Sequence, residues 1–379
     1  MSRILVITHF EGKAKALTSL LARLGDGGKN EVIVFYGEKL PCPKKSWLYR
    51  TAMRIDTYLF YRNMPQSEYY KTRAVENYPL WIKWGIKLRL FDLISVRNWV
   101  GRVKTHNKPD ERIVNELRQI KPDWVIGTPL TYWQSHVEGE YIKAAQSLGI
   151  KTAGLVLTWD NLTTKNRFYP IPDVVFAWNE LHKQELIKYH EVPESKIEVV
   201  GSFVFEHWLS AKPFISKKQF CEKYELDPLK PIYCYLGSSL SIAGKDDGVM
   251  AKGLIRVYPE AQFILRPHPS NADVFDGMEN VLTGKRGNEG QIIREDAIES
   301  YLYSEFIYGL NTSAMLEAAL VGGKIRIIPG LPETQRDALH FKWLDNFENS
   351  KGSMKKLLGF QEKLPSELIK DFIKNVDML

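Results

Sequence analysis

The fold is decided by one stretch of the sequence, Gln262-Phe263-Ile264-Leu265-Arg266-Pro267-His268-Pro269. It begins as an apolar run of the length of a buried strand. Pro267 and Pro269 have no N–H group to donate, so the regular structure must end there. The pattern therefore places Arg266 and His268 at the carboxyl end of a strand, where ligands bind in open α/β sheets. The permanent charge of Arg266 and the titratable charge of His268 suit a phosphate or another anion. The alternative is an ordinary end of a strand with solvated polar residues.

Length and composition indicate a folded globular protein of two or three domains, with 379 residues, 44% of them hydrophobic and 26% charged. No apolar run approaches ~18 residues and the N-terminus has no secretory pattern, so we expect a cytoplasmic protein without a transmembrane helix. The cysteines Cys42, Cys221 and Cys234 are too widely spaced for a disulfide framework or a zinc site. The net charge of +7 favours an anionic partner, which can be a nucleotide, a nucleic acid or a membrane surface.

Strands and helices alternate in two runs separated near residues 203–213. Alternation at this spacing predicts parallel strands joined by right-handed crossovers. We expect an α/β fold of two doubly wound, Rossmann-like domains that face each other across a central cleft. The predicted bounds are 1–207 for the first domain, 208–360 for the second, and 361–379 for a C-terminal helix that crosses back to the first.

The first domain carries an insertion over residues 44–108, with fourteen Lys or Arg against four Asp or Glu and many aromatic residues between them. Within it, residues 81–91 resemble an interfacial helix, with tryptophan anchors and basic residues that reach anionic head groups. Three interpretations remain: helices packed on the core with solvated basic faces, a membrane-surface patch, or a nucleic-acid site. The last is the least favoured, because no helix-turn-helix, zinc-finger or RNP-like signature is present.

In the second domain three strand ends should converge. The first is the small, hydroxyl-rich loop with Ser238 and Ser239, and the second is the opening stretch. The third is the helix start at Asn311-Thr312-Ser313, where free N–H groups and hydroxyls form an anion site. Taken together the three ends predict a nucleotide-phosphate site, and a plain helix cap is the alternative for the third.

In the first domain the strongest candidate is Asp160, which follows a predicted strand and adjoins Trp159, Asn161 and Lys165. A carboxylate beside a tryptophan is expected to have a raised pKa and to act as a general base on an acceptor hydroxyl. The alternative is an Asx turn or a helix cap. His9 and Glu11, after the first strand, are competing acid/base candidates that would leave Asp160 as the acceptor anchor.

Several kinds of site are not indicated by the sequence. There is no His/Cys/Asp cluster at metal-ligand spacing, no P-loop, and no three-glycine dinucleotide fingerprint. We therefore expect neither a bound metal nor a resident cofactor.

The order of these motifs resembles that of GT-B glycosyltransferases, and is most similar to capsule polysaccharide transferases and CDP-glycerol glycerophosphotransferases. The resemblance implies that His268 contacts the donor phosphate with Arg266 nearby, and that Asn311-Thr312-Ser313 holds this phosphate at a helix N-terminus. It also implies a carboxylate near the donor at Glu317. The glycerophosphotransferases have Trp-His-Gly-Thr-Pro where this chain has residues 159–163, so an aspartate replaces their histidine base. This departure argues against glycerol phosphate transfer.

We therefore expect a metal-independent glycosyltransferase that uses a CMP-, CDP- or UDP-linked sugar in the synthesis of a bacterial surface polysaccharide such as a capsule. The donor would bind the second domain, and a glycan or lipid-linked acceptor the first. Attachment to the inner face of the plasma membrane through 44–108 is an accompanying expectation. The alternatives are a nucleotide-sugar epimerase of the same build, a glycerophosphotransferase, and a non-catalytic basic adaptor that binds membranes or nucleic acid.

Overall fold

The computed structural model describes residues 1–8, 17–40, 43–131, 137–240, 243, 246–278, 281–283, 295–310, 312–328, 339–344 and 347–377. These residues form two compact units. The first comprises Met1–Glu206, Ala338–His340 and Leu358–Leu379. The second comprises His207–Asp337 and Phe341–Leu357. Among the described residues, no helix is both long enough and apolar enough to span a bilayer.

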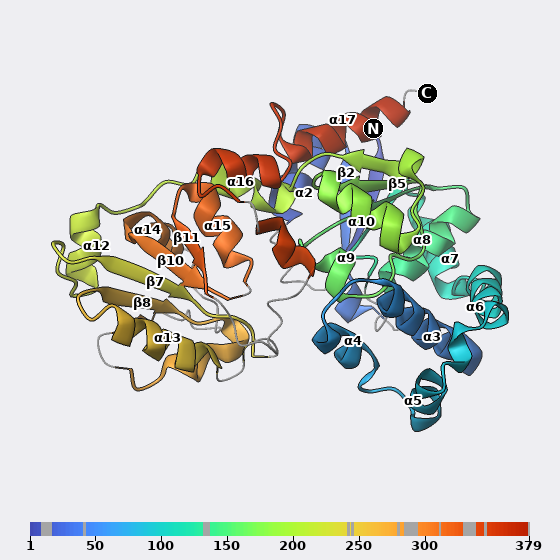
Figure 1. Ribbon diagram of the computed structural model, residues 1–379. Helices are drawn as coiled ribbons and strands as arrows, with labels where there is room; N and C mark the ends of the chain where they lie inside the picture. Colours follow the sequence, from blue (N-terminus) through green and yellow to red (C-terminus); the bar gives the residue numbers. More distant parts are fainter. Residues whose placement is uncertain are drawn as a thin grey trace. The chain divides into compact units, whose positions relative to one another are not determined.

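The first unit is built on a six-stranded parallel sheet with the order β2-β1-β3-β4-β5-β6. Its helices cover both faces of the sheet (Figure 1). The strands are β1 (Arg3–Thr8), β2 (Glu31–Tyr36), β3 (Trp124–Thr128), β4 (Lys151–Leu155), β5 (Val174–Ala177) and β6 (Ile197–Val199). The helices outside the insertion are α2 (Thr18–Leu24), α7 (Glu111–Ile120), α8 (Val137–Ser147), α9 (Asn161–Thr164), α10 (Glu180–His190) and α17 (Pro365–Asp377).

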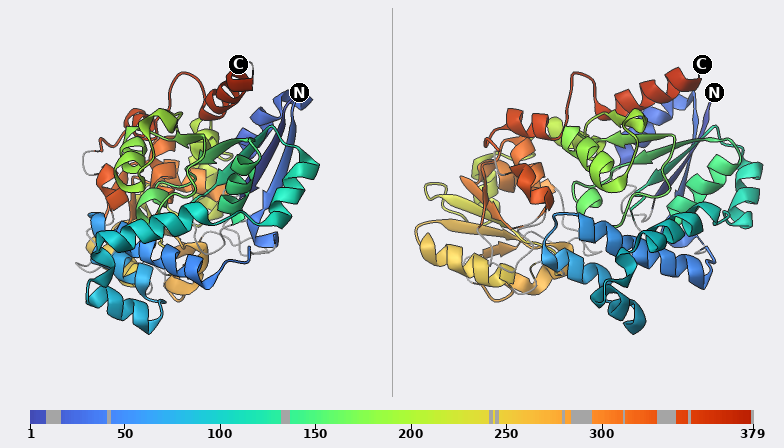
Figure 2. Two further views of the ribbon diagram at one scale, coloured as in Figure 1. Left: turned by 90° about the vertical axis from the view of Figure 1, so that its right-hand side faces the viewer. Right: turned by 45° about the vertical axis from the view of Figure 1, so that its right-hand side comes forward.

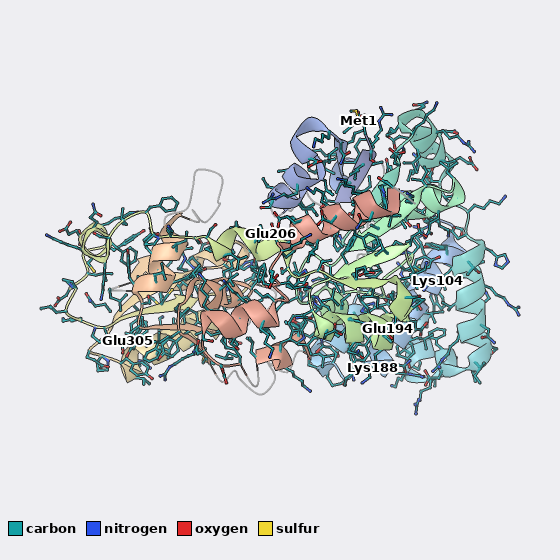
Figure 3. The ribbon with its side chains drawn as sticks, turned by 90° about the horizontal axis from the view of Figure 1, so that it is seen from above. Met1, Lys104, Lys188, Glu194, Glu206 and Glu305 are labelled. Carbon is teal, nitrogen blue, oxygen red and sulfur yellow. The ribbon has the colours of Figure 1, made fainter. Side chains whose placement is uncertain are left out.

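The C-terminal helix α17 belongs to this unit and packs with α2 on one face of the sheet (Figure 2). Its Ile369 and Ile373 are buried in the core, and the Phe372 ring lies 5.4 Å from that of Phe176 on β5. Its first turn is fixed by Glu206, labelled in Figure 3, which accepts hydrogen bonds from the Ser366 backbone N–H (2.5 Å) and hydroxyl (2.8 Å). Burial of this apolar stripe fixes the last helix to the first sheet.

The insertion forms four helices that pack against the rest of the first unit: α3 (Trp47–Asn63), α4 (Glu68–Val75), α5 (Leu80–Lys87) and α6 (Ile94–His106). Its attachment includes a buried ion-pair network. Asp56 on α3 lies 2.7 Å from the Lys104 ammonium group and 3.3 Å from the guanidinium of Arg167. Lys45 pairs with Glu140 of α8 at 2.5 Å. Removing one member of such a buried pair leaves an uncompensated charge, so the network fixes where the insertion lies.

The second unit is built on a five-stranded parallel sheet with the order β11-β10-β7-β8-β9. The strands are β7 (Ile232–Leu236), β8 (Gln262–Arg266), β9 (Val281–Thr283), β10 (Phe306–Gly309) and β11 (Ile325–Ile327). The helices are α12 (Lys217–Lys223), α13 (Asp246–Val257), α14 (Glu295–Tyr303), α15 (Ala314–Val321) and α16 (Lys351–Leu357), and the short α11 (Glu206–Leu209) lies at the unit boundary. Figure 1 shows α13 on one face of the sheet and α14 and α15 on the other.

Strand order fixes where each sheet can bind a ligand. In the second unit the chain runs outward from β7 to β9, and then continues on the other side of β7 with β10 and β11. In the first unit the same reversal lies between β1 and β3. Ligands of open α/β sheets bind at such reversals, beyond the carboxyl ends of the strands. The predicted phosphate site follows β7, β8 and β10 at such a reversal, whereas Asp160 follows β4, the strand next to β3.

Candidate functional site: two sheet edges

In the second unit, the loops after β7 and β8 lie against each other. The Gly237 N–H donates to the Arg266 carbonyl at 2.9 Å. A Cβ atom at Gly237 would lie 3.1 Å from the His268 nitrogen and 3.2 Å from Pro267 Cα. Glycine at this position therefore lets the two loop backbones approach each other more closely than a residue with a side chain would. The predicted serine loop and the Arg-Pro-His-Pro stretch meet at this point.

Ser238 is fully buried, and its position is set by Asp247 in the first turn of α13. Asp247 accepts from the Ser238 N–H at 2.6 Å, from the Tyr235 hydroxyl at 2.8 Å and from the Asn271 amide at 3.3 Å. Burial raises the pKa of Asp247 to about 6, although these hydrogen bonds act in the opposite direction. Ser239 is half-buried at the same turn. Asp247 thus anchors the loop that the sequence predicts as part of the phosphate site.

His268 is half-buried and its tautomer is fixed by the turn that follows it. Its Nδ1 accepts from the Ser270 backbone N–H at 3.1 Å and lies 2.9 Å from the Ser270 hydroxyl. Because Nδ1 acts as an acceptor, the neutral ring carries its proton on Nε2. Burial lowers the pKa of His268, which favours this neutral form. The ring therefore offers an N–H donor suited to a phosphate oxygen.

Arg266 lies on the face of the sheet that α12 and α14 cover. It is buried, and its guanidinium donates to the Ser300 hydroxyl of α14 at 3.2 Å. Alternate residues of a strand share a face, so Arg266 points the same way as Ile264, which packs with α12. Its predicted contact with the donor phosphate stays a prediction.

The third predicted element, the start of α15, follows β10. Thr312 and Ser313 precede the first helical residue, and the Thr312 hydroxyl accepts from the Ala314 N–H at 3.4 Å. Within the described residues, the Ser313 side chain does not cap the helix. The start of α15 follows the carboxyl end of β10, and Glu317 lies in its first turn. The N–H groups of residues 314–317 donate to oxygen atoms of Thr312 and Ser313, so this turn offers a ligand the positive end of the helix dipole. Asn311 lies outside the described residues.

In the first unit, the loop after β4 holds Asp160 at the start of α9, with about 26% of its side chain exposed. Its carboxylate accepts from the hydroxyls of Thr158 (2.6 Å) and Thr164 (2.7 Å) and lies 3.6 Å from the Lys165 ammonium group. Burial alone would raise the pKa of this carboxyl. The charges of Lys165 and His340 and the two hydroxyls outweigh burial, and the pKa lies well below its usual range. The expected raised pKa is therefore wrong.

The other members of this predicted set differ in exposure. Trp159 and Asn161 are buried, and the Asn161 amide oxygen closes the loop by accepting from the N–H groups of Leu157 (3.0 Å) and Thr158 (2.9 Å). Lys165 keeps about 29% of its side chain exposed. Asp160 and Lys165 are therefore the members that a ligand can reach. His9 and Glu11 lie outside the described residues.

Three buried histidines contact this loop, and no local sequence pattern marks them as part of the site. His182 Nε2 lies 3.3 Å from the Trp159 carbonyl oxygen, and His190 Nε2 lies 2.7 Å from that of Leu162. His340 Nδ1 lies 3.3 Å from the Thr163 hydroxyl, and its ring is 4.8 Å from that of Trp159. Gln66 also contributes by donating to the Thr163 carbonyl at 2.8 Å. The loop is held rigidly by residues far away in the sequence.

Acid should destabilise the first unit because these histidines are buried in the neutral form. Burial lowers the pKa of His182 and His190 to about 3, and that of His340 to about 4, from 6.5. Below pH 6.5 the unfolded chain binds more protons than the folded one, so stability falls as the pH falls. Each histidine contributes a loss that approaches about 1.4 kcal/mol per pH unit.

Urea midpoints measured between pH 7.5 and pH 5 check this prediction. We expect a steady decrease, a smaller one in His190→Gln, and an unchanged slope in the exposed control His106→Gln. A midpoint that stays constant or rises towards pH 5 would contradict the assignment of buried neutral histidines.

The described residues contain no group of three or more His, Cys, Asp or Glu placed to hold a metal ion. The two sheet edges present the His268 N–H, the Lys165 ammonium group and the positive end of the α15 dipole. Such donors can stabilise a negative charge that develops on a departing phosphate.

The fold has clear counterparts among solved structures. S. aureus MnaA, solved with UDP, has a TM-score of 0.54 at 12% identity, over 100% of this chain and 98% of that one. The glycosyltransferase SnogD from Streptomyces nogalater has a TM-score of 0.51 at 10% identity, over 99% of both chains. The UDP-GlcNAc 2-epimerase of Methanocaldococcus jannaschii, in complex with UDP-GlcNAc and UDP, has a TM-score of 0.50 at 12% identity, over 100% of both.

By sequence, no protein-family model matches the chain, and no curated protein matches it either. The structural likeness nevertheless extends over whole chains and agrees with the two Rossmann-like sheets. The chain therefore has the GT-B fold.

Proposed function

We propose that the protein is an enzyme that binds a nucleotide-activated sugar at the carboxyl edge of the second unit's sheet. The observation that supports the proposal is that β10, β7 and β8 are neighbours in the sheet, and that the start of α15, the Gly237–Ser238 turn and His268 follow their carboxyl ends. A helix N-terminus beside a neutral donor side chain suits a diphosphate. Structures of the same fold that contain UDP or UDP-GlcNAc support a UDP-linked donor, and CMP- and CDP-linked sugars are the other members of the proposed class.

We propose glycosyl transfer as the reaction, with a glycan or lipid-linked hydroxyl as acceptor at the first unit. The His268 N–H and the α15 N-terminus would stabilise the departing nucleotide phosphate. Because its pKa is lowered, Asp160 is a weak base, so we assign it to holding Lys165 and the rigid loop. His9 or Glu11, which follow β1 in the sequence, would then take the acceptor proton. The resemblance to capsule transferases supports a role in bacterial surface polysaccharide synthesis.

A nucleotide-sugar epimerase is the second candidate. It is favoured by the full-length likeness to an epimerase structure that contains UDP-GlcNAc. An epimerase would act on the donor alone, whereas a transferase releases nucleotide in proportion to acceptor consumed.

Product analysis of each donor, with and without a glycan acceptor, separates the two reactions. Transfer predicts a new glycosidic bond and free nucleotide only when acceptor is present. A donor stereoisomer formed without acceptor would establish the epimerase instead. If no nucleotide sugar is converted or bound under either condition, the enzyme proposal fails and the basic adaptor becomes the better account.

A further inference from the structure

The helix α5 and its flanks carry a cluster of exposed apolar side chains. Nine of the sixteen large hydrophobic residues that are exposed within the described chain belong to it. Leu80, Leu93 and Ile94 are 74%, 58% and 75% exposed, and Trp84 is 60% exposed. We call this cluster the α5 patch: Trp47, Leu48, Leu80, Trp81, Trp84, Leu88, Leu90, Leu93 and Ile94.

The exposed apolar side of α5 is not the side that packs on the protein core, because α5 has a separate buried side. Ile82 is fully buried, and the Phe91 ring packs so closely on Gly85 that a Cβ there would lie 2.5 Å from Phe91 Cζ. At 3.6 residues per turn, Leu80, Trp81, Trp84 and Leu88 fall within an arc of about 100° that contains neither Ile82 nor Gly85. The helix is thus anchored by one face and presents a second apolar face to solvent.

The helix α5 lies on the side of the insertion far from the six-stranded sheet (Figures 1 and 2). Trp47 and Trp81 contact each other across α3 and α5, with ring centroids 5.9 Å apart. The apolar surface is therefore continuous over two helices. Contiguous exposed patches of this kind mark interaction surfaces.

The charges around the α5 patch are basic. Lys83, Lys87, Arg89 and Arg97 lie between residues 80 and 100, where Asp92 is the one acidic residue. Asp92 is neutralised by ion pairs with Arg62 and with Arg89, the latter at 3.0 Å. The Lys87 ammonium group lies over the Trp84 ring, 5.6 Å from its centroid, so a basic group adjoins an exposed indole of the patch.

We propose that the α5 patch binds the surface of an anionic phospholipid membrane. Tryptophan and leucine would insert at the head-group level, while Lys83 and Lys87 would pair with lipid phosphates. Charge complementarity selects lipid over a second copy of this chain, because two identical basic surfaces repel each other. The proposal does not depend on which reaction the sheet edges perform.

Flotation of the full-length protein with vesicles tests this proposal. We expect binding to phosphatidylglycerol-containing vesicles and at least about tenfold weaker binding to phosphatidylcholine alone. Trp84→Ser with Leu88→Ser should weaken binding to the anionic vesicles by about tenfold or more, since the inserted apolar groups provide the adhesion. The matched control is Phe214→Ser with Leu229→Ser, which alters two residues of the second unit that are 73% and 92% exposed, against 60% for both Trp84 and Leu88.

Both double variants change exposed residues, and their thermal midpoints should match that of the wild type. Quenching of tryptophan fluorescence by brominated lipid should occur in the wild type and the control, and decrease in the Trp84 variant. The proposal is overturned if the wild type does not float with anionic vesicles, or if the Trp84 variant floats equally well. A patch variant that changes only the oligomeric state would show that the surface joins copies of the chain.

Discussion

Replacing Asp247 by alanine is expected to lower the free energy of unfolding by about 2–4 kcal/mol, because each buried donor left without an acceptor costs about 1–3 kcal/mol. The Ser238 N–H and the Tyr235 hydroxyl would lose their buried acceptor, and the Asn271 amide would lose one of its contacts. The loop after β7, which belongs to the proposed phosphate site, would then lose its anchor. Nucleotide affinity should therefore decrease together with stability.

The neighbouring Asp246 provides a matched control in the same helical turn. Asp246→Ala removes a charge that favours the helix dipole, which costs about 0.3–1 kcal/mol. Asp247→Asn keeps an acceptor for Ser238 and should lose far less stability than the alanine variant. Urea denaturation of the variants measures these differences. Equal effects of Asp246→Ala and Asp247→Ala would show that Asp247 acts only through the dipole.

The pH dependence provides a second check on Asp247. The folded pKa of about 6 lies above the ordinary value of 3.8, so the folded state binds more protons between these values. Stability from this group is present at low pH and lost as the pH rises through about 6. Asparagine does not titrate, so Asp247→Asn lacks this loss. The free energy of unfolding of Asp247→Asn minus that of the wild type should therefore be larger at pH 8 than at pH 5.

The second large effect is expected for His268→Ala, which should weaken the affinity for a nucleoside diphosphate by about 10- to 100-fold. The range follows from a hydrogen bond to a charged phosphate, which contributes about 1.5–3 kcal/mol. The variant would also remove the cap that Nδ1 provides to the Ser270 N–H. A loss of affinity could therefore arise from the turn rather than from Nε2.

His268→Asn separates these two causes. Asparagine is a good N-cap and can accept from Ser270, but it has no group at the position of Nε2. We expect its thermal midpoint to stay near that of the wild type while the affinity falls as in His268→Ala. His106→Ala, which removes an exposed histidine, should leave the affinity unchanged. Full affinity in His268→Asn would assign His268 to the turn alone.

The fold was predictable from the sequence because its signals are local. The apolar run at 262–266 and the prolines after it predict where β8 ends, and the alternation of elements predicts two parallel sheets. Strand alternation also contains a signal for the orientation of Arg266. Arg266 shares a face with Ile264, so its burial against α14 follows from the period of two.

The chemistry of the sites was less predictable because it depends on distant contacts. The pKa of Asp160 reflects His340, whose partner Thr163 is 177 residues away in the sequence, as well as the nearby Lys165. Asp247 has the pattern of an ordinary helix start, and only the packing of α13 shows that it is buried. The roles of His9, Glu11 and Asn311 stay predictions.

Calorimetric titration of the wild type with UDP, CDP, GDP and CMP tests the central claim most directly. The account predicts saturable binding of a nucleoside diphosphate at about one site per chain, weakened at least about tenfold in His268→Asn and unchanged in His106→Ala. Absence of binding by every nucleotide, or binding that His268→Asn leaves intact, would contradict a phosphate site at the carboxyl edge of β7, β8 and β10.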